Sequence, residues 1–146
     1  PMSGGSIRHP HSQIIGLRNY DYHEDITVKN MNGWLLHEDQ DVRITLSKHP
    51  IIGFFEYNLR YKPDAPVRSI AMRLQQTIRY VLDSLAKFSQ SYNYFFYQLE
   101  DGYEYIKVIP RYITTPLYVG YKIPQTCNDE RAAKILHNIT PYFELK

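Results

Sequence analysis

The chain has 146 residues, of which 43% are hydrophobic and 22% are charged, a composition typical of one globular domain with a moderate core. Its formal charge is only +2, so there is no broad basic field to attract nucleic acid or anionic lipid. The single cysteine cannot form an internal disulfide, and no apolar run approaches the roughly 20 residues that span a bilayer. These features argue against nucleic-acid and membrane partners and predict a cytoplasmic protein.

The first part of the chain combines turn-forming residues, a histidine-rich motif and predicted strands. Residues 3–6 are small and flexible, and residues 9–13 read His-Pro-His-Ser-Gln directly before two isoleucines. This order places the motif at a loop-to-strand junction. Residues 19–32 are polar and predicted to be irregular. Clusters of β-branched and aromatic residues then predict three strands, at 33–37, 42–46 and 53–59, with the first hairpin turn at 39–41.

The second part of the chain adds helices to these strands. Apolar residues recur at helical spacing from Val67 to Phe88, which predicts a long helix ending near residue 89. Further elements are predicted as strands at 92–99 and 103–109 joined by a tight turn, an extended stretch at 117–123, and a short terminal helix from about 128 to 139. The expected fold class is therefore α+β, with an antiparallel sheet, one long helix and one short helix.

The histidine motif suggests covalent chemistry on phosphorus. An imidazole can attack a phosphorus atom, carry a nucleotidyl group as a phosphoramidate and pass it to a second phosphate acceptor. In extended backbone the side chains of His9, His11 and Gln13 lie on one face. One imidazole could then attack while the other orients it, and the glutamine amide could donate to a phosphate oxygen. The Ser6 hydroxyl and the backbone of the preceding glycines could also approach the phosphates.

Two other interpretations of the motif remain open at this point. Two histidines beside a proline can simply be surface loop residues. They can also ligate zinc, although their spacing supplies no third or fourth ligand.

Residues 5–13, Gly-Ser-Ile-Arg-His-Pro-His-Ser-Gln, resemble the active-site segment of galactose-1-phosphate uridylyltransferase, a branch of the histidine triad superfamily. The resemblance implies that His11 is the covalent nucleophile and that His9 supports it. It also implies that Gln13 and Ser6 hold phosphate oxygens. The fold that it implies is a histidine triad-like α+β architecture.

A second stretch, residues 103–111, resembles the HxHxHxxPR frame of a histidine triad strand. Tyr103, Tyr105 and Lys107 stand at the histidine positions, while the proline and arginine of the frame are kept. Since Tyr105 and Lys107 also replace the family's metal-binding histidines, the resemblance implies that no metal and no cofactor are bound. Further on, Tyr121 matches a sugar-binding tyrosine, but Lys122 replaces the family's glutamate and leaves the sugar undefined.

The remaining ionisable residues suggest no further site. The charges of Lys107 and Arg111 are expected to be solvated more often than to contact phosphate, and the tyrosines of the frame are expected to pack in the core. The other histidines form no cluster by spacing and are interpreted as surface or cap residues: His23, His37, His49 and His137.

The resemblance covers the chain from Ser3 to about Ile139 and divides it into two parts. Residues 1–30 match the end of a first histidine triad-like repeat that carries the HPHxQ motif, and residues 31–146 match a degenerate second repeat. Because the family places the rest of the first repeat ahead of the motif, we expect the chain to be a C-terminal portion of a longer polypeptide. A homodimer is expected by analogy, since relatives complete their active sites across subunits.

The function expected from the sequence is a nucleotidyltransferase that acts on a nucleotide sugar or a sugar phosphate through a nucleotidyl-histidine intermediate. One alternative is a phosphorylase or hydrolase of nucleotide sugars or dinucleoside polyphosphates that uses the same histidine. The other is a non-catalytic nucleotide-binding protein, which the lost second triad favours.

Overall fold

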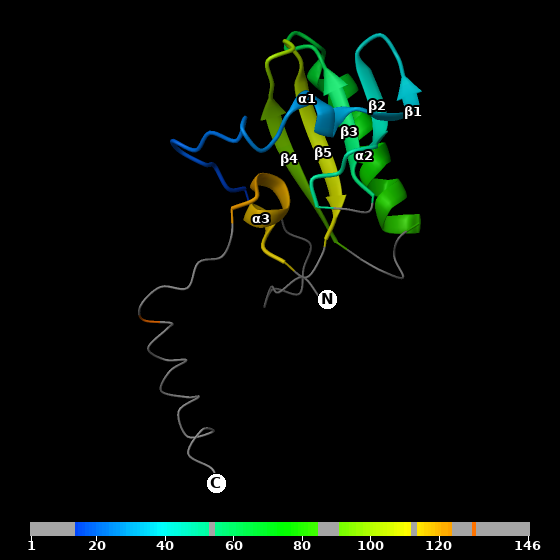
Figure 1. Cartoon of the computed structure of the whole chain (residues 1–146). Coiled ribbons are helices and arrows are strands. Elements are labelled where there is room, and N and C mark those ends of the chain that lie inside the picture. Colours follow the sequence, from blue (N-terminus) through cyan, green and yellow to red (C-terminus); the bar gives the residue numbers. More distant parts are fainter. Residues whose placement is uncertain (1–13, 53–54, 85–90, 112–113, 124–129, 131–146) are drawn as a thin grey trace.

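The computed structural model describes residues 14–52, 55–84, 91–111, 114–123 and 130. Within these residues five strands form one open antiparallel sheet in the order β1-β2-β3-β5-β4 (Figure 1). The elements in chain order are α1 (Val28–Met31), β1 (Gly33–Glu38), β2 (Val42–Ser47), β3 (Tyr57–Tyr61), α2 (Val67–Ser84), β4 (Tyr92–Gln98), β5 (Glu104–Pro110) and α3 (Pro116–Tyr121). This architecture confirms the α+β class and the antiparallel sheet.

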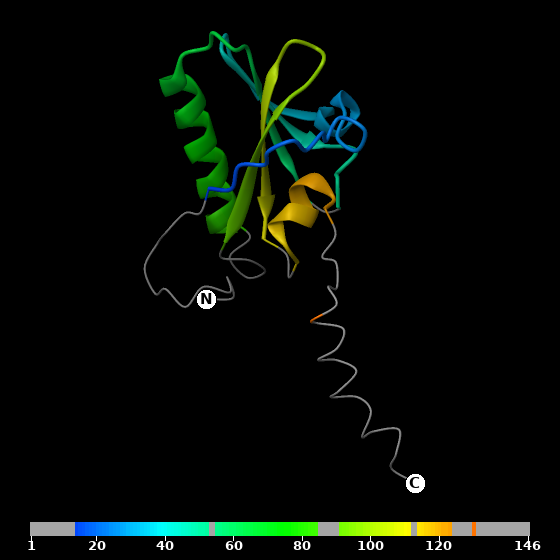
Figure 2. The same ribbon diagram turned by 90° about the vertical axis from the view of Figure 1, so that its left-hand side faces the viewer.

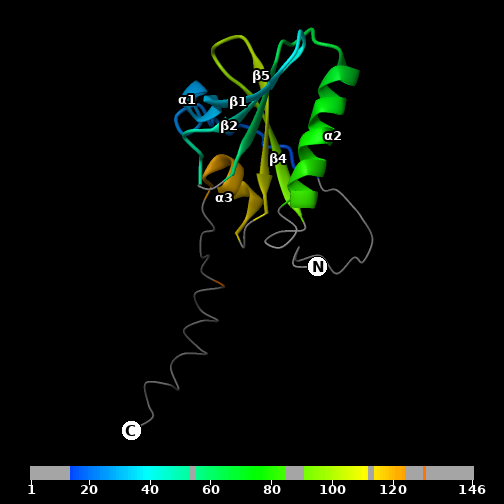
Figure 3. The same cartoon turned by 90° about the vertical axis from the view of Figure 1, so that its right-hand side faces the viewer.

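Helices cover both faces of the sheet. The long helix α2 lies against one face, and the short helices α1 and α3 lie against the other (Figures 2 and 3). Beneath α2 a cluster of aliphatic residues is fully shielded from solvent, including Leu59, Val81 and Val108. The opposite cluster is rich in aromatic residues and contains Phe95 and Tyr97. The strand β5 is buried on both sides because it lies inside the sheet between these two clusters.

The turn between β1 and β2 is held by one carboxylate, as the predicted hairpin at residues 39–41 requires. Asp39 accepts hydrogen bonds from the backbone N–H groups of Asp41 at 2.9 Å and Val42 at 2.8 Å. The side chain of Arg73, on α2, donates to the same carboxylate at 2.8 Å. The two backbone donors and this guanidinium hold the pKa of Asp39 well below its ordinary value. Asp39 therefore ties α2 to the hairpin.

The prediction of an extended stretch at 117–123 is wrong, because these residues form most of helix α3. Pro116 occupies the start of the helix, where its missing N–H is not needed. Gly120 then allows close approach to the sheet, since a Cβ at this position would lie 2.2 Å from the ring of Phe95. The alternating apolar pattern of this stretch hence reflects a short helix with Val119 and Gly120 buried, not a strand.

Several predicted boundaries also need correction. The stretch predicted to be irregular contains α1, and the third strand begins at Tyr57 instead of residue 53. The long helix is described as far as Ser84, and the predicted terminal helix lies outside the described residues apart from Glu130. In the described ranges, no helix combines the length and apolar character needed to cross a membrane.

Candidate functional site

The four residues that the sequence assigns to phosphate chemistry, Ser6, His9, His11 and Gln13, lie outside the described residues. The chain is described from Ile14 onward, directly after the motif. A few residues later the Tyr20 hydroxyl donates to the backbone oxygen of Tyr121 at 2.7 Å. This bond fixes the segment downstream of the motif to the C-terminal end of α3.

Tyr121, the predicted sugar-binding residue, belongs to an aromatic cluster. Its ring meets those of Tyr20, at a centroid distance of 6.2 Å, and Phe95, at 5.8 Å, both in edge-to-face geometry. Its hydroxyl donates to the backbone oxygen of Phe96 on β4 at 3.3 Å. Burial raises the pKa of Tyr121 above its ordinary value. The residue thereby connects α3, the edge strand β4 and the segment that follows the motif.

His23 fastens the same segment to β4. Its Nδ1 lies 2.7 Å from an Asp21 carboxylate oxygen, and its Nε2 lies 3.0 Å from the backbone oxygen of Gln98. Both contacts are made together only when both ring nitrogens carry a proton, so the Asp21 carboxylate and the Gln98 carbonyl raise the pKa of His23. The sequence analysis interpreted His23 as a surface or cap residue, although the aspartate two positions earlier was an available signal for an ion pair.

Lys107, which the resemblance to a histidine triad strand sets at the third histidine position, is fully buried. Its ammonium group donates to a carboxylate oxygen of Glu56 and to the backbone oxygen of Asn30, each at 2.9 Å. Glu56, equally buried, also accepts the N–H groups of Ile51 at 2.9 Å and Ile52 at 3.0 Å. Burial lowers the pKa of Lys107, and the Glu56 carboxylate opposes that shift. The expectation of a solvated lysine is wrong because α1 covers this part of the sheet.

The ion pair belongs to a group of buried polar side chains beneath α1, which we call the polar layer: Thr45, Ser47, Glu56, Asn58 and Lys107. The Asn30 backbone oxygen accepts from both Lys107 and the Ser47 hydroxyl. The Met31 backbone oxygen accepts from Thr45 at 3.2 Å and from the Asn58 amide at 3.0 Å. Since these donors satisfy the last carbonyls of a four-residue helix, the polar layer docks α1 onto the sheet.

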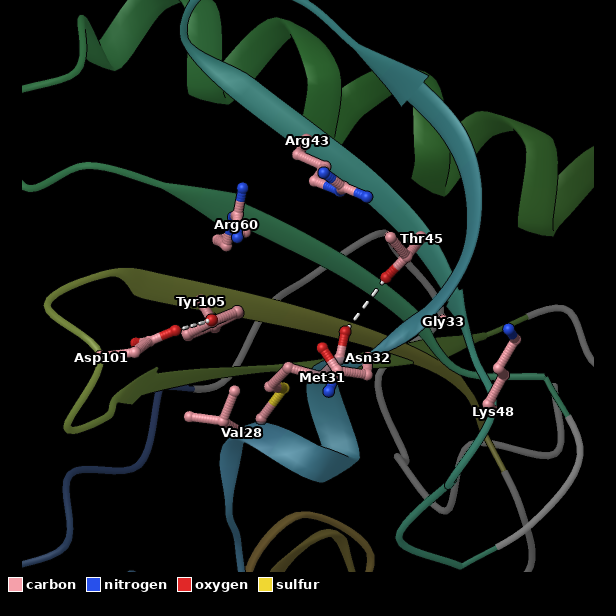
Figure 4. Close-up of a pocket in the computed structure, with 10 residues that line it drawn as sticks. All are labelled: Val28, Met31, Asn32, Gly33, Arg43, Thr45, Lys48, Arg60, Asp101 and Tyr105. Atoms are coloured by element: carbon pink, nitrogen blue, oxygen red, sulfur yellow. Dashed lines mark hydrogen bonds between the residues drawn. The ribbon is translucent and has the colours of Figure 1, made fainter.

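Beside the polar layer lies a cavity of about 300 Å³, which we call the basic pocket (Figure 4). Val28 and Met31 of α1 form an apolar wall. Arg43 and Arg60 project from neighbouring strands, where they are direct cross-strand partners. The lining residues are Val28, Met31, Asn32, Gly33, Arg43, Thr45, Lys48, Arg60, Asp101 and Tyr105. The pocket therefore combines one apolar side with a mainly cationic one.

The two arginines differ in how their charge is balanced. Arg43 forms a 3.2 Å ion pair with Glu38, and both side chains are about 40% exposed. The guanidinium of Arg60 stacks over the Tyr103 ring, 4.3 Å from its centre, and makes no ion pair with a carboxylate in the described part of the chain. Asp101, the acidic residue of the lining, accepts a hydrogen bond from the Tyr105 hydroxyl. Lys48 also lines the cavity, but its ammonium group lies over the Trp34 ring, 5.3 Å from the ring centre. With two arginines and one aspartate, the lining is cationic.

The sequence analysis did not single out the two pocket arginines. The available signal was the two-residue period of β2, which places Arg43 on the same face as Thr45. That signal alone could not reveal the pairing of Arg43 with Arg60, which depends on the register of β2 and β3. Across the described ranges, no group of three or more His, Cys, Asp or Glu side chains could hold a metal ion.

The described residues define an α+β protein whose open antiparallel sheet carries a polar layer and a basic pocket on the face beneath α1. The chain belongs to the DUF4931 family: residues 23–143 match the family model described as the C-terminal domain of a domain of unknown function, DUF4931. No curated protein matches the chain.

A solved structure supports this membership. The chain is similar to a DUF4931 family protein from Bacillus cereus ATCC 10987 known from a crystal structure, with 38% sequence identity and a TM-score of 0.66. The match covers 98% of this chain and 64% of the Bacillus chain.

Proposed function

We propose that the protein is a nucleotidyltransferase of the histidine triad type, with His11 as its nucleophile. The observation that carries the proposal is the motif His-Pro-His-Ser-Gln at residues 9–13, because alternate residues of an extended segment share one face, and this spacing would place two imidazoles and an amide together. On this view residues 1–30 are the end of a first repeat. Residues 31–146 are a second, degenerate repeat.

The polar layer supports this division of roles. At the third histidine position of the degenerate strand stands Lys107, whose ammonium group is buried and bonded to Glu56 and Asn30. A group held in this way is not free to attack a substrate, so the second repeat offers no nucleophile at this position. The proposal therefore assigns the chemistry to the motif at residues 9–13.

Each half of the reaction exchanges one bond at phosphorus. A ring nitrogen of His11 attacks the α-phosphorus of a nucleotide sugar, a P–N bond forms, and the P–O bond to the departing sugar phosphate breaks. An oxygen of a second phosphate acceptor then attacks the same phosphorus and displaces the histidine. His9 would position the nucleophile, and Gln13 and Ser6 would stabilise the phosphate charge.

Tyr121 supports the proposal through its contact with the segment that follows the motif. The backbone oxygen of Tyr121 accepts from Tyr20, which follows the motif closely in the chain, and its ring is only half-buried. We therefore assign the exposed side of this aromatic cluster to the sugar, in line with the match of Tyr121 to a sugar-binding tyrosine.

The test is intact-protein mass spectrometry of the full-length protein with UDP-, ADP- and GDP-sugars in the absence of an acceptor. An acid-labile nucleotidyl adduct is expected on His11, and a His11→Asn variant should lose it. A His49→Asn variant, which changes an exposed histidine, is the matched control. Full transfer activity in His11→Asn would overturn the proposal.

Acceptor dependence separates the proposed reaction from its neighbours. Turnover that requires a sugar phosphate identifies the transferase, whereas turnover with inorganic phosphate or water identifies a phosphorylase or hydrolase. Nucleotide binding with neither adduct nor turnover would identify a non-catalytic binder. Size-exclusion chromatography with light scattering would show whether the active form is a homodimer.

A further inference from the structure

We propose that the basic pocket is a second ligand site, which binds a small phosphate monoester with its phosphate against Arg43 and Arg60 and its organic part against α1. This site lies on the sheet face beneath α1 and does not rest on the proposed chemistry at His11. Its residues come from α1, β1, β2, β3, β5 and the loops beside them.

The pairing of the two arginines is the first argument. Arg43 and Arg60 are direct partners in the β2–β3 register and lie on the same face of the sheet (Figure 4). Like charges directly opposite each other destabilise a sheet. Only one of the two has a carboxylate partner within the described residues, Glu38 on Arg43. Such an arrangement is stabilised when an anion binds between the two side chains.

The donor chemistry favours phosphate. Guanidinium groups bind phosphate oxygens with two parallel N–H donors, which gives both strength and orientation. Lys48 also lines the cavity, and its ammonium group lies over the Trp34 ring, 5.3 Å from the ring centre. Asp101, whose carboxylate accepts a hydrogen bond from Tyr105, is the acidic residue of the lining, so the two guanidinium groups leave the lining with a net positive charge. A phosphate dianion matches the charges of the two guanidinium groups better than a monoanion does.

The size and the apolar wall define the rest of the ligand. A cavity of about 300 Å³ is at the lower end of the range for small-molecule sites, too small for a macromolecular chain to enter. Val28 and Met31 offer apolar surface opposite the arginines (Figure 4). A compact ring or short carbon skeleton attached to the phosphate would cover that surface, and an ester should therefore bind more tightly than inorganic phosphate.

The test is isothermal titration calorimetry of the full-length protein at low ionic strength with inorganic phosphate, phenyl phosphate and, as an uncharged control, phenol. Saturable binding of both phosphates is expected, tighter for phenyl phosphate, with no binding of phenol. Arg60→Gln should weaken phosphate binding by about tenfold, the effect of losing one charge-assisted contact. Arg79→Gln, which changes an arginine 84% exposed on α2, is the matched control and should have no effect.

Two further variants locate the binding. Val28→Ala should reduce the advantage of phenyl phosphate over inorganic phosphate and leave the affinity for inorganic phosphate unchanged. His11→Asn, which removes the nucleophile of the proposed reaction, should leave binding at the pocket unchanged. The proposal is overturned if no saturable binding is seen, if Arg60→Gln behaves like Arg79→Gln, or if His11→Asn abolishes the binding. Equal affinity for the two phosphates would overturn the assignment of an ester.

Discussion

The polar layer and the basic pocket lie side by side on one sheet face, but they differ in whether their charged side chains have partners of opposite charge. In the polar layer Lys107 and Glu56 are fully buried and are hydrogen-bonded to each other and to backbone groups. In the basic pocket Arg60 keeps partial exposure and lacks an acidic partner among the described residues. Paired, buried charges of the first kind are expected to have a structural role. A partly exposed cation of the second kind is expected to bind a ligand.

The comparison also bears on the resemblance of residues 103–111 to a histidine triad strand. Histidines at alternate positions of such a strand would face the same side as α1, where Tyr105 and Lys107 now lie. Tyr105 packs in the aromatic cluster, and Lys107 donates to the Asn30 backbone oxygen of α1. The side chains of this face support α1, and α1 in turn forms one wall of the basic pocket.

The largest effect is expected where the polar layer is broken. Lys107→Met should lower the free energy of unfolding by about 3–5 kcal/mol, because it leaves the Glu56 carboxylate buried without a counter-charge. Urea denaturation measures the loss, and Lys62→Met, at an exposed position, should change stability by less than about 0.5 kcal/mol.

A double variant tests the reason for this loss. Adding Glu56→Gln to Lys107→Met removes the stranded charge while keeping an acceptor for a backbone N–H group, so part of the stability should return. A loss below about 1 kcal/mol in Lys107→Met alone would mean that the pair does not act as a buried ion pair.

A much smaller effect is expected in the basic pocket. Arg60→Gln should leave the free energy of unfolding within about 0.5 kcal/mol of the wild type, because relief of the repulsion from Arg43 offsets the lost contact with the Tyr103 ring. Thermal unfolding provides the measurement, with and without phenyl phosphate. Phenyl phosphate should raise the melting temperature of the wild type more than that of the variant at the same concentration, because the variant binds it more weakly. A large loss of stability in the absence of ligand would mean that Arg60 has a structural role, like Lys107 and Glu56.

The smallest effect is expected at His23, whose exposed ion pair with Asp21 lies outside both the polar layer and the basic pocket. The contacts with Asp21 and Gln98 raise its pKa above the ordinary 6.5. Its contribution is therefore fully present below about pH 6.5 and is lost as the pH rises through the raised pKa. Relative to wild type, His23→Gln should be less stable at pH 6 and indistinguishable at pH 9 in urea unfolding. His49→Gln is the control, and a pH-independent difference would contradict this account.

The sequence predicted most of the regular structure. Clusters of apolar, β-branched and aromatic residues located β1 and β2 to within about a residue. The helical repeat from Val67 located α2, since this pattern arises from burial of one face of a helix. The turn at Asp39 followed from local chemistry, in which a carboxylate accepts nearby backbone N–H groups. The motif at residues 9–13 was also visible at this level, because the identity of its residues suggests the chemistry.

What the tertiary structure decided concerns residues whose roles depend on distant partners. Lys107 and Glu56 are 51 positions apart, and no local pattern indicates that a charged residue on a strand will be buried with a counter-ion. The helical state of Pro116–Tyr121 likewise depends on the space that Gly120 leaves for Phe95. The basic pocket depends on the register of β2 and β3, which sets Arg43 opposite Arg60, and on α1, which supplies the apolar wall. Short-range patterns determine which elements form, whereas pairing and packing determine which charges are buried and which remain open to a ligand.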